Sequence, residues 1–302
     1  MKNVKTLSPK LDVVFQALFG EVGNESITKG FLETILERKI DSIDLSRNPI
    51  LRREFKEEKL GVLDIIAKLD KNEICNIELQ IVDKKNIIER ILYYWSRLYS
   101  RQIKSGEDYK ILQKAIVILI TDFKIENLEE LDYHSRWKIM EDKRGKKIIL
   151  TQKLEIDIIE LPKIIGKEKE QDNLLDWLYF LENPKSERVT EKMKENENLK
   201  EAVKKLDNLS EDEKMQRIAD LRQKAIMDEK AIYEKGLEVG IEKGMKEGIQ
   251  REIEKGIEKG LMEGSQKEKI EIAKKMLELK IDKETIAKAT GLTEQEIEKI
   301  LN

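Results

Sequence analysis

The chain has 302 residues, of which 39% are hydrophobic and 39% charged, and its formal net charge at pH 7 is −3. This length suits one large domain with an appendage, or two domains, and the apolar share is enough for a core. The near-neutral balance excludes a polycation, so any contact with nucleic acid must come from a local patch.

The chain has one cysteine, Cys75, and one histidine, His134. An intrachain disulfide is therefore excluded, as is a zinc site of Cys and His alone, so any metal must be held mainly by carboxylates. Residues 1–12 lack an apolar signal core, and the longest strongly apolar run, 115–120, is far shorter than a membrane span. We therefore expect a protein of the reducing cytoplasm with no membrane segment.

Apolar periodicity and turn residues predict alternating helices and strands up to Pro184. The predicted helices cover 11–19, 26–36, 86–102 and 174–181, and the predicted strands cover 60–69, 73–82, 115–121, 133–140 and 148–161. Because 115–121 is apolar without alternation, we expect this strand to be buried on both faces. The pattern indicates an α/β fold.

The helix predicted over 86–102, with Asn86 as its N-cap, has two distinct stripes. One is apolar and the other is basic and partly aromatic: Ile88, Ile91, Trp95 and Leu98 on the first, and Arg90, Tyr94, Arg97 and Arg101 on the second. The wider segment 83–114 carries eight Lys and Arg against four acidic residues. Such a run is either a solvated face or a surface for phosphates.

The composition changes after Pro184, where we place a domain boundary. Residues 185–264 are charged and helical, and within 236–264 a glycine recurs every four residues except at Glu252. Seven glycines in a helix cost roughly 7 kcal/mol relative to alanine, which close packing against another helix could offset. The tract therefore indicates self-association of the C-terminal helices, or alternatively a mobile spacer that grew by repeat slippage.

Residues 265–302 form the third predicted segment, and 283–301 look like two short helices around Gly291. Helix-turn-helix DNA readers have this outline. The second helix begins with Glu294, Gln295 and Glu296, which suit phosphates poorly. We favour a helical hairpin for packing over a DNA reader.

The predicted strands 60–69 and 73–82 carry the candidate chemistry, because side chains alternate along a strand. In the second strand Asn76, Glu78 and Gln80 share one face, and in the first strand Asp64 opposes an apolar face. If the apolar faces join one core, Asp64 and Glu78 share the other side of the sheet.

The turn between these strands is consistent with that arrangement. A two-residue loop would pair Asp64 with Leu79 and put an acid in the core, whereas the three-residue loop 70–72 pairs Asp64 with Glu78. Such loops favour a left-handed residue in third place, which Asn72 tolerates. Two adjacent carboxylates need a shared proton, a nearby cation or a metal, and Mg²⁺ prefers such oxygens. The alternative is an ordinary exposed polar face.

These residues resemble the Rpn family of recombination-promoting nucleases, also described as transposases, within the PD-(D/E)XK nuclease superfamily. The likeness covers about 8–182 and extends more loosely to the end. It rests on the segments around Asp12, Asp64, Glu78–Gln80, Arg90–Tyr99 and Glu160–Lys163, and on the glycine-spaced tail. It implies a restriction-endonuclease-like core, with a mixed central sheet flanked by helices and an α-helical C-terminal extension.

The resemblance also implies site residues. Asp64 and Glu78 would bind Mg²⁺ with the main-chain carbonyl of Leu79, and Gln80 would position the attacking water. Gln80 stands where most of the superfamily has lysine, and it brings no positive charge. Lys68, on the same predicted face as Asp64, is a candidate replacement for that charge. Asp12 either completes the site or caps its helix.

Three further assignments follow from the residues themselves. Arg90, Tyr94, Arg97 and Arg101 either contact DNA phosphates or form a solvated stripe over a packed tyrosine. His134 is interpreted as structural, because no second histidine accompanies it. Trp95, Trp137 and Trp177 are expected in the core.

We therefore expect a Mg²⁺-dependent DNA endonuclease linked to recombination or mobile elements, with residues 1–184 as the nuclease domain. Two alternatives stay open: a catalytically inactive DNA-binding protein on a nuclease-derived fold, and a helical self-assembly protein.

Overall fold

The computed structural model describes residues 5–45, 65–83, 85–143 and 147–301. The chain divides into two compact units, Met1–Asp228 and Glu229–Asn302. The long helix α7, Glu213–Glu278, begins in the first unit and ends in the second. Among the described residues, no helix combines the length and the apolar character that crossing a lipid bilayer requires.

A six-stranded mixed sheet, in the order β1-β2-β3-β4-β6-β5, forms the centre of the first unit as the structure describes it. The strands are β1 (Ile43–Asp44), β2 (Ile65–Leu69), β3 (Glu73–Gln80), β4 (Lys114–Thr121), β5 (His134–Trp137) and β6 (Leu154–Glu160). β3, β4 and β6 are parallel, and the other neighbours are antiparallel. The predicted α/β class with a mixed central sheet is confirmed.

β4 lies between two parallel neighbours, and every residue from Ala115 to Ile120 is fully buried. An apolar run without alternation suits this position, because helices cover both faces of the sheet. The strand buried on both faces that the sequence predicts is thus confirmed.

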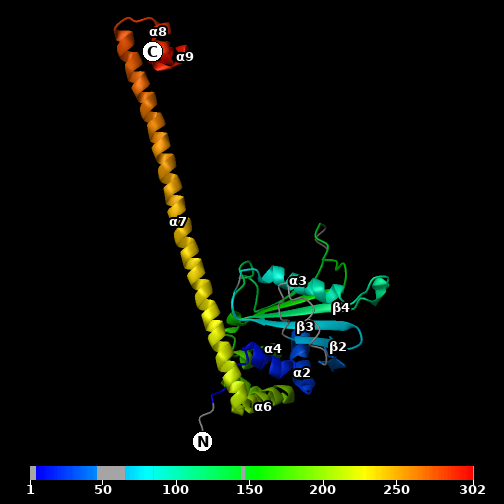
Figure 1. Ribbon diagram of the computed structural model, residues 1–302. Helices are drawn as coiled ribbons and strands as arrows, with labels where there is room; N and C mark the ends of the chain where they lie inside the picture. The colour runs from blue at the N-terminus through cyan, green and yellow to red at the C-terminus, as the bar shows by residue number, and fades with distance from the viewer. Residues whose placement is uncertain (1–4, 46–64, 84, 144–146, 302) are drawn as a thin grey trace. The chain divides into compact units, whose positions relative to one another are not determined.

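Helices cover the two faces of the sheet unequally (Figure 1). α1 (Asp12–Phe19), α2 (Glu25–Leu36), α4 (Asn173–Glu182) and α6 (Glu197–Glu211) share one apolar core with the sheet. The other face packs against α3 (Ile87–Ser100) alone among the described α-helices, in a smaller core. Two short 3₁₀ helices, Tyr109–Ile111 and Leu161–Ile164, join neighbouring elements.

The larger core is built around Trp177, which is fully buried. Its ring centroid lies 6.1 Å from that of Phe19 and 5.5 Å from that of Phe31, so α1, α2 and α4 meet there. Trp95 is partly buried in the smaller core and stacks on Tyr99. Trp137 is 42% exposed, so its prediction as a core residue is wrong. It lies on β5, the edge strand of the sheet as described, which pairs with β6.

The first unit extends beyond the boundary that we predicted at Pro184. α5 (Glu187–Lys192), α6 and the start of α7 contribute buried side chains to the larger core: Val189, Leu199, Ala202, Leu206 and Ala219. The predicted boundary thus falls inside a compact unit, because an amphipathic stripe in the charged region packs on α1 and α2.

The second unit holds the rest of α7, α8 (Lys283–Thr290) and α9 (Glu294–Leu301). Ala273, Ile286, Leu292 and Ile297 form its small core. The glycine tract 236–264 is helical and exposed throughout. A Cβ built on any of its seven glycines would meet nothing within 4 Å.

Gly30 on α2 faces α6 at very close range. A Cβ there would lie 2.4 Å from Nδ2 and 2.7 Å from Cβ of Asn198. The second distance involves an atom next to the α6 backbone, so rotating the Asn198 side chain does not relieve the clash.

We predict that Gly30→Ala lowers the free energy of unfolding by about 1–3 kcal/mol, because overpacking outweighs the gain in helix propensity. Urea unfolding followed by circular dichroism would measure it. Gly248→Ala is the matched control and should not destabilise the protein, since the space around Gly248 is open. A Gly30→Ala protein at least as stable as the parent would contradict the prediction.

Candidate functional site

The hairpin of β2 and β3 sets the position of the candidate acid Glu78. Ile65 pairs with Ile77 and Leu69 pairs with Glu73, so the connection is the three-residue segment 70–72. The predicted loop length and register are confirmed for these pairs. The left-handed residue, however, is Asp70, with φ 50°, and not Asn72 in third place.

Asp70 connects this turn by hydrogen bonds to the two residues that precede β1 in the same chain. Its Oδ1 accepts hydrogen bonds from the main-chain N–H groups of Asp41 (2.8 Å) and Ser42 (3.0 Å), and its own N–H donates to the carbonyl of Ser42. Arg38 lies 3.4 Å from Oδ2. The hydrogen bond from the Ser42 N–H, together with those from Asp41 and Arg38, holds the pKa of the Asp70 carboxyl below its usual value.

Glu78 lies on the face of the sheet that α3 covers, and its side chain is only 1% exposed. The alternative of an ordinary exposed polar face is therefore wrong for this residue. A buried carboxylate needs compensation, since burial without partners is costly. Arg90 on α3 supplies it: its Nη2 lies 2.8 Å from Oε1 of Glu78.

Gln80 completes a closed triangle with these two side chains. Its Nε2 donates to Oε1 of Glu78 (2.9 Å), and its Oε1 accepts from Nη1 of Arg90 (3.0 Å). Arginine can only donate hydrogen bonds, and a carboxylate can only accept them. These contacts therefore determine the orientation of the Gln80 amide, with Nε2 toward Glu78 and Oε1 toward Arg90. Glu78, Gln80 and Arg90 form what we call the Glu78 triad.

Tyr94 supports the triad from the next turn of α3. It is buried, its ring centroid lies 5.6 Å from the Arg90 guanidinium carbon, and its hydroxyl lies 3.4 Å from Arg90 Nη2. α3 buries Ile87, Ile91, Tyr94 and Leu98, while Ile88 is exposed. The predicted apolar stripe is confirmed for Ile91 and Leu98, and Trp95 packs against the smaller core, but Ile88 is wrong. Ile87 and Tyr94 are buried in addition.

The predicted basic stripe of α3 divides into two parts. Arg90 and Tyr94 belong to the Glu78 triad and its support. Arg97 lies 5.8 Å from the Tyr93 ring, and Arg101, the C-cap of α3, is exposed. In the second part, Tyr93 and Arg101 are exposed and Arg97 is half-buried.

The remaining predicted site residues are placed as follows. Asp64 lies outside the described residues, and Leu79 follows Glu78 in β3. Lys68 is exposed on β2, opposite Ile74. Within the described ranges, no group of three His, Cys, Asp or Glu side chains has the arrangement to hold a metal ion. A metal site at Glu78 would therefore need at least one ligand other than the described His, Cys, Asp and Glu side chains.

Asp12 is the first residue of α1, and its N-cap is Leu11, so the N-cap interpretation of Asp12 is wrong by one position. Arg222 of α7 contacts both carboxylate oxygens of Asp12, at 2.8 and 2.7 Å. α1 packs on the face of the sheet opposite to α3. Asp12 thus contacts α7, whereas the residues of the Glu78 triad come from β3 and α3.

Sequence reasoning missed two polar features near the carboxyl end of β3. Lys10 Nζ lies 2.9 Å from Oδ1 of Asp122, the residue after β4, and 2.8 Å from Oε2 of Glu182, the last residue of α4. Asn76 is fully buried on the Glu78 face, and neither polar atom of its amide has a hydrogen-bond partner in the structure as described. The alternation of β3 places Asn76 correctly, but nothing in the sequence shows that it is left unsatisfied.

A second polar cluster lies on the other face of the sheet, around Asp157 of β6. Its Oδ1 accepts from Arg136 (2.9 Å) and contacts His134 Nε2 (2.8 Å). Arg136 also binds the carbonyl of Ile35 at the end of α2. His134 thus has a partner within the fold, in keeping with its interpretation as structural.

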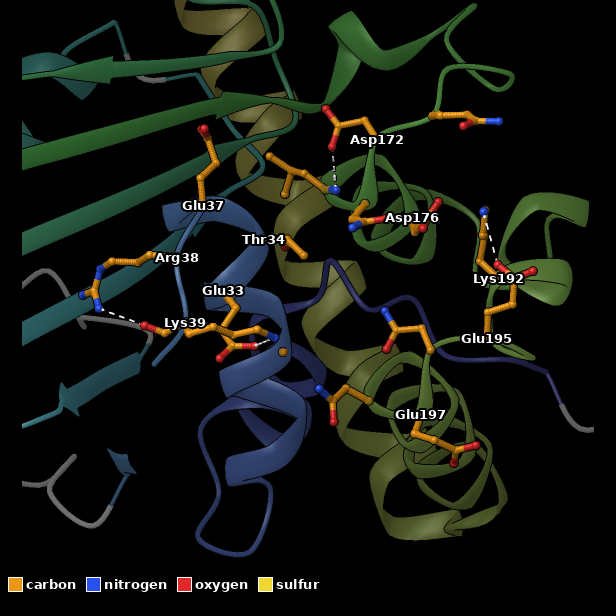
Figure 2. Close-up of a pocket in the computed structure, with 16 residues that line it drawn as sticks. Glu33, Thr34, Glu37, Arg38, Lys39, Asp172, Asp176, Lys192, Glu195 and Glu197 are labelled. Carbon is orange, nitrogen blue, oxygen red and sulfur yellow. Dashed lines mark hydrogen bonds and ion pairs between the residues drawn. The ribbon is translucent and has the colours of Figure 1, made fainter. Parts of the chain in front are cut away.

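A pocket of about 970 Å³ opens among α2, α4, α5 and α6 (Figure 2). Its acids outnumber its bases, and Lys39 and Lys192 are already paired with Glu33 and Glu195. Such a balance disfavours the phosphates of a nucleic acid. The pocket lies among helices of the larger core, on the face opposite to α3.

The C-terminal helices meet in a tight turn. Gly291 ends α8 in the left-handed conformation, with φ 71°. The Thr293 N–H donates to Glu296 Oε2 (2.8 Å), and the Glu296 N–H donates to Thr293 Oγ1 (3.3 Å). This reciprocal pair is a capping box. Glu296, which seemed unsuited to a DNA reader, therefore has a structural reason to stand at this helix start.

The patterns of two known protein families match parts of the chain. The pattern of the PD-(D/E)XK nuclease family transposases matches residues 9–236. The chain belongs to this family. The pattern of the Rpn/YhgA-like nuclease family C-terminal HTH domain matches residues 266–302. No curated protein and no solved structure matches the chain.

The resemblance to the Rpn nucleases is thereby confirmed, and with it a nuclease- or transposase-related role. Our preference for a packing hairpin at the C-terminus is corrected, because the family describes this segment as a helix-turn-helix domain. Helix-turn-helix domains are DNA-binding modules, which supports DNA as a partner of this chain.

We predict that Asp70→Asn lowers stability in a pH-dependent way. The lowered pKa of Asp70 means that its ionised form favours folding, so its contribution is fully present above the unfolded pKa of about 3.9 and is lost as pH falls through the folded value. Urea unfolding between pH 7 and pH 3 should show the gap between parent and variant closing below about pH 4. Asp207→Asn, at an exposed site on α6, is the control. A gap that is undiminished at pH 3 would contradict this.

Proposed function

We propose that the protein is a metal-dependent DNA endonuclease whose active site is built on the β2–β3 hairpin. The observation that carries the proposal is the buried Glu78, held by Arg90 and Gln80 on a hairpin of known register. The sequence prediction pairs Asp64, the residue before Ile65, with Glu78. A buried charge cluster in a family of nucleases is a functional-site candidate.

Glu78 and Asp64, with the main-chain carbonyl of Leu79, are the groups that would hold the metal. They offer only oxygen donors, which suits Mg²⁺. Within the described part of the chain, the buried amide of Asn76, one strand repeat from Glu78, has no hydrogen-bond partner, which supports unused polar capacity on this face. A divalent cation bound there would supply charge stabilisation for a phosphodiester and lower the pKa of a bound water.

Gln80 would orient the attacking water. One amide hydrogen bonds Glu78 and one oxygen lone pair accepts from Arg90, which leaves a second hydrogen and a second lone pair for a water. Arg97 and Arg101, with Tyr93, would contact the DNA backbone from the outer surface of α3. Lys68 and Asp12 stay candidates for auxiliary roles, and the family suggests DNA recombination or mobile elements as the setting.

We also propose that α7 associates with a second copy of the chain. An exposed apolar residue follows six of the seven glycines and also Glu252, namely Leu237, Ile241, Met245, Ile249, Ile253, Ile257 and Leu261. A row repeating every four residues advances about 400° per step and therefore winds around the helix. A solitary helix gains nothing from such a row, whereas a partner helix would bury it.

The nuclease proposal predicts Mg²⁺-dependent nicking of plasmid DNA by the purified protein. Glu78→Gln should reduce the rate by at least about 100-fold, the scale expected when one charge-stabilising group is lost. Asp64→Asn should do the same, and Glu89→Gln, on the exposed side of α3, should have no effect.

Gel assays of nicking, with EDTA added to parallel samples, would test this. Nicking that survives both EDTA and Glu78→Gln would reject the proposed site. DNA binding without cleavage under Mg²⁺ or Mn²⁺ would favour the alternative of a catalytically inactive DNA-binding protein on a nuclease-derived fold.

The association proposal predicts a dimer or larger species in sedimentation velocity. Replacing Ile241, Ile249 and Ile257 together with Gln should produce a monomer while the helix content stays nearly constant. The control replaces Lys243, Arg251 and Lys259 in the same repeats with Gln and should leave the assembly unchanged. A parent protein that is monomeric at all concentrations would show that the glycine tract is a spacer.

A further inference from the structure

One oxygen of Glu78 receives two hydrogen bonds in this structure. Oε1 accepts from Arg90 Nη2 at 2.8 Å and from Gln80 Nε2 at 2.9 Å. A metal ion that bound Oε1 would compete with these donors for its lone pairs. Arg90 and Gln80 thus both bind the same oxygen of this carboxylate.

The contact between Arg90 and Glu78 lies in a weakly solvated place, since the side chains are 24% and 1% exposed. Charges interact more strongly there than in water. A divalent cation and a guanidinium at the same oxygen would repel each other, so the two cannot both occupy it at full strength.

Arg90 has other contacts that do not involve Glu78. Its Nη1 donates to Gln80 Oε1 at 3.0 Å, and its guanidinium lies over the Tyr94 ring at 5.6 Å. These contacts would keep the guanidinium beside the site after it leaves the carboxylate. From there, it could take a phosphate in place of Glu78, because arginine binds both groups through the same fork of N–H donors.

We propose that Arg90 is a positioning residue that neutralises Glu78 in the metal-free protein and competes with the divalent cation for it. The proposal rests on the function proposed above, in which Glu78 is a metal ligand. Metal binding requires Arg90 to leave Glu78, and a DNA phosphate favours this exchange by accepting the guanidinium. Metal and DNA therefore strengthen each other's binding, by the same factor in both directions.

The full chain is titrated with Mn²⁺ alone, and free Mn²⁺ is followed by electron paramagnetic resonance. Arg90→Met removes the competing charge and keeps most of the side-chain volume, so Mn²⁺ should bind about 10-fold more tightly, equal to about 1.4 kcal/mol. Arg217→Met, at an exposed position of α7, is the matched control and should match the parent. Glu78→Gln should abolish this binding.

A second titration adds a short phosphorothioate duplex, which keeps the backbone charge. DNA should raise the Mn²⁺ affinity of the parent clearly more than that of Arg90→Met. Because Arg90→Met risks misfolding, a third measurement uses the parent protein: the guanidinium NMR signal of Arg90 should shift in step with Mg²⁺ binding.

The outcomes separate the two proposals. If the parent and Glu78→Gln bind Mn²⁺ equally, or if neither binds it even with DNA present, Glu78 is not a ligand and both proposals fail. If the parent binds and Glu78→Gln does not, the site stands. In that case, unchanged or weaker binding by Arg90→Met, or an Arg90 signal insensitive to Mg²⁺, overturns the competition alone.

Discussion

The three-residue connection between β2 and β3 decides which face of the sheet receives Glu78. Side chains alternate along a strand, so a slip of one residue in this hairpin would move every side chain to the opposite face. Glu78 would then enter the aromatic core around Trp177, and Ile77 would face α3. Asp70, anchored to Asp41 and Ser42, holds the connection at its observed length. The Glu78 triad depends on this local constraint.

The sequence was sufficient to predict this hairpin because its determinants are local. Alternation identifies the faces of β3, and the need to keep acids out of the core selects the loop length. The same reasoning failed for the left-handed residue, where Asp70 takes the role expected of Asn72. Contacts of Asp70 with Asp41 and Ser42, some 30 residues earlier in the chain, favour that choice, and no turn rule includes such contacts.

The sequence did not predict correctly which face of α3 packs on the sheet. The pattern identified an amphipathic helix, but its buried stripe begins at Ile87 and not at Ile88, and it carries Tyr94 inward. That rotation aims Arg90 at Glu78. The sequence leaves two alternatives for Arg90, a phosphate contact or a solvated stripe over a packed tyrosine, and offers Lys68 as the candidate replacement for the missing lysine charge. The cation that the structure brings to Glu78 comes from α3, and only the packing of this helix on the sheet reveals it.

The exposed stretch of α7 also has a consequence for proteases. No side chain between 236 and 264 belongs to any of the three hydrophobic cores, and the glycines weaken the helix along this stretch. Backbone that opens locally is the preferred substrate of a protease. Its many Lys and Arg residues make the stretch a natural target for trypsin. Cleavage there would release an α/β fragment and a helix-turn-helix fragment, each with its buried residues intact.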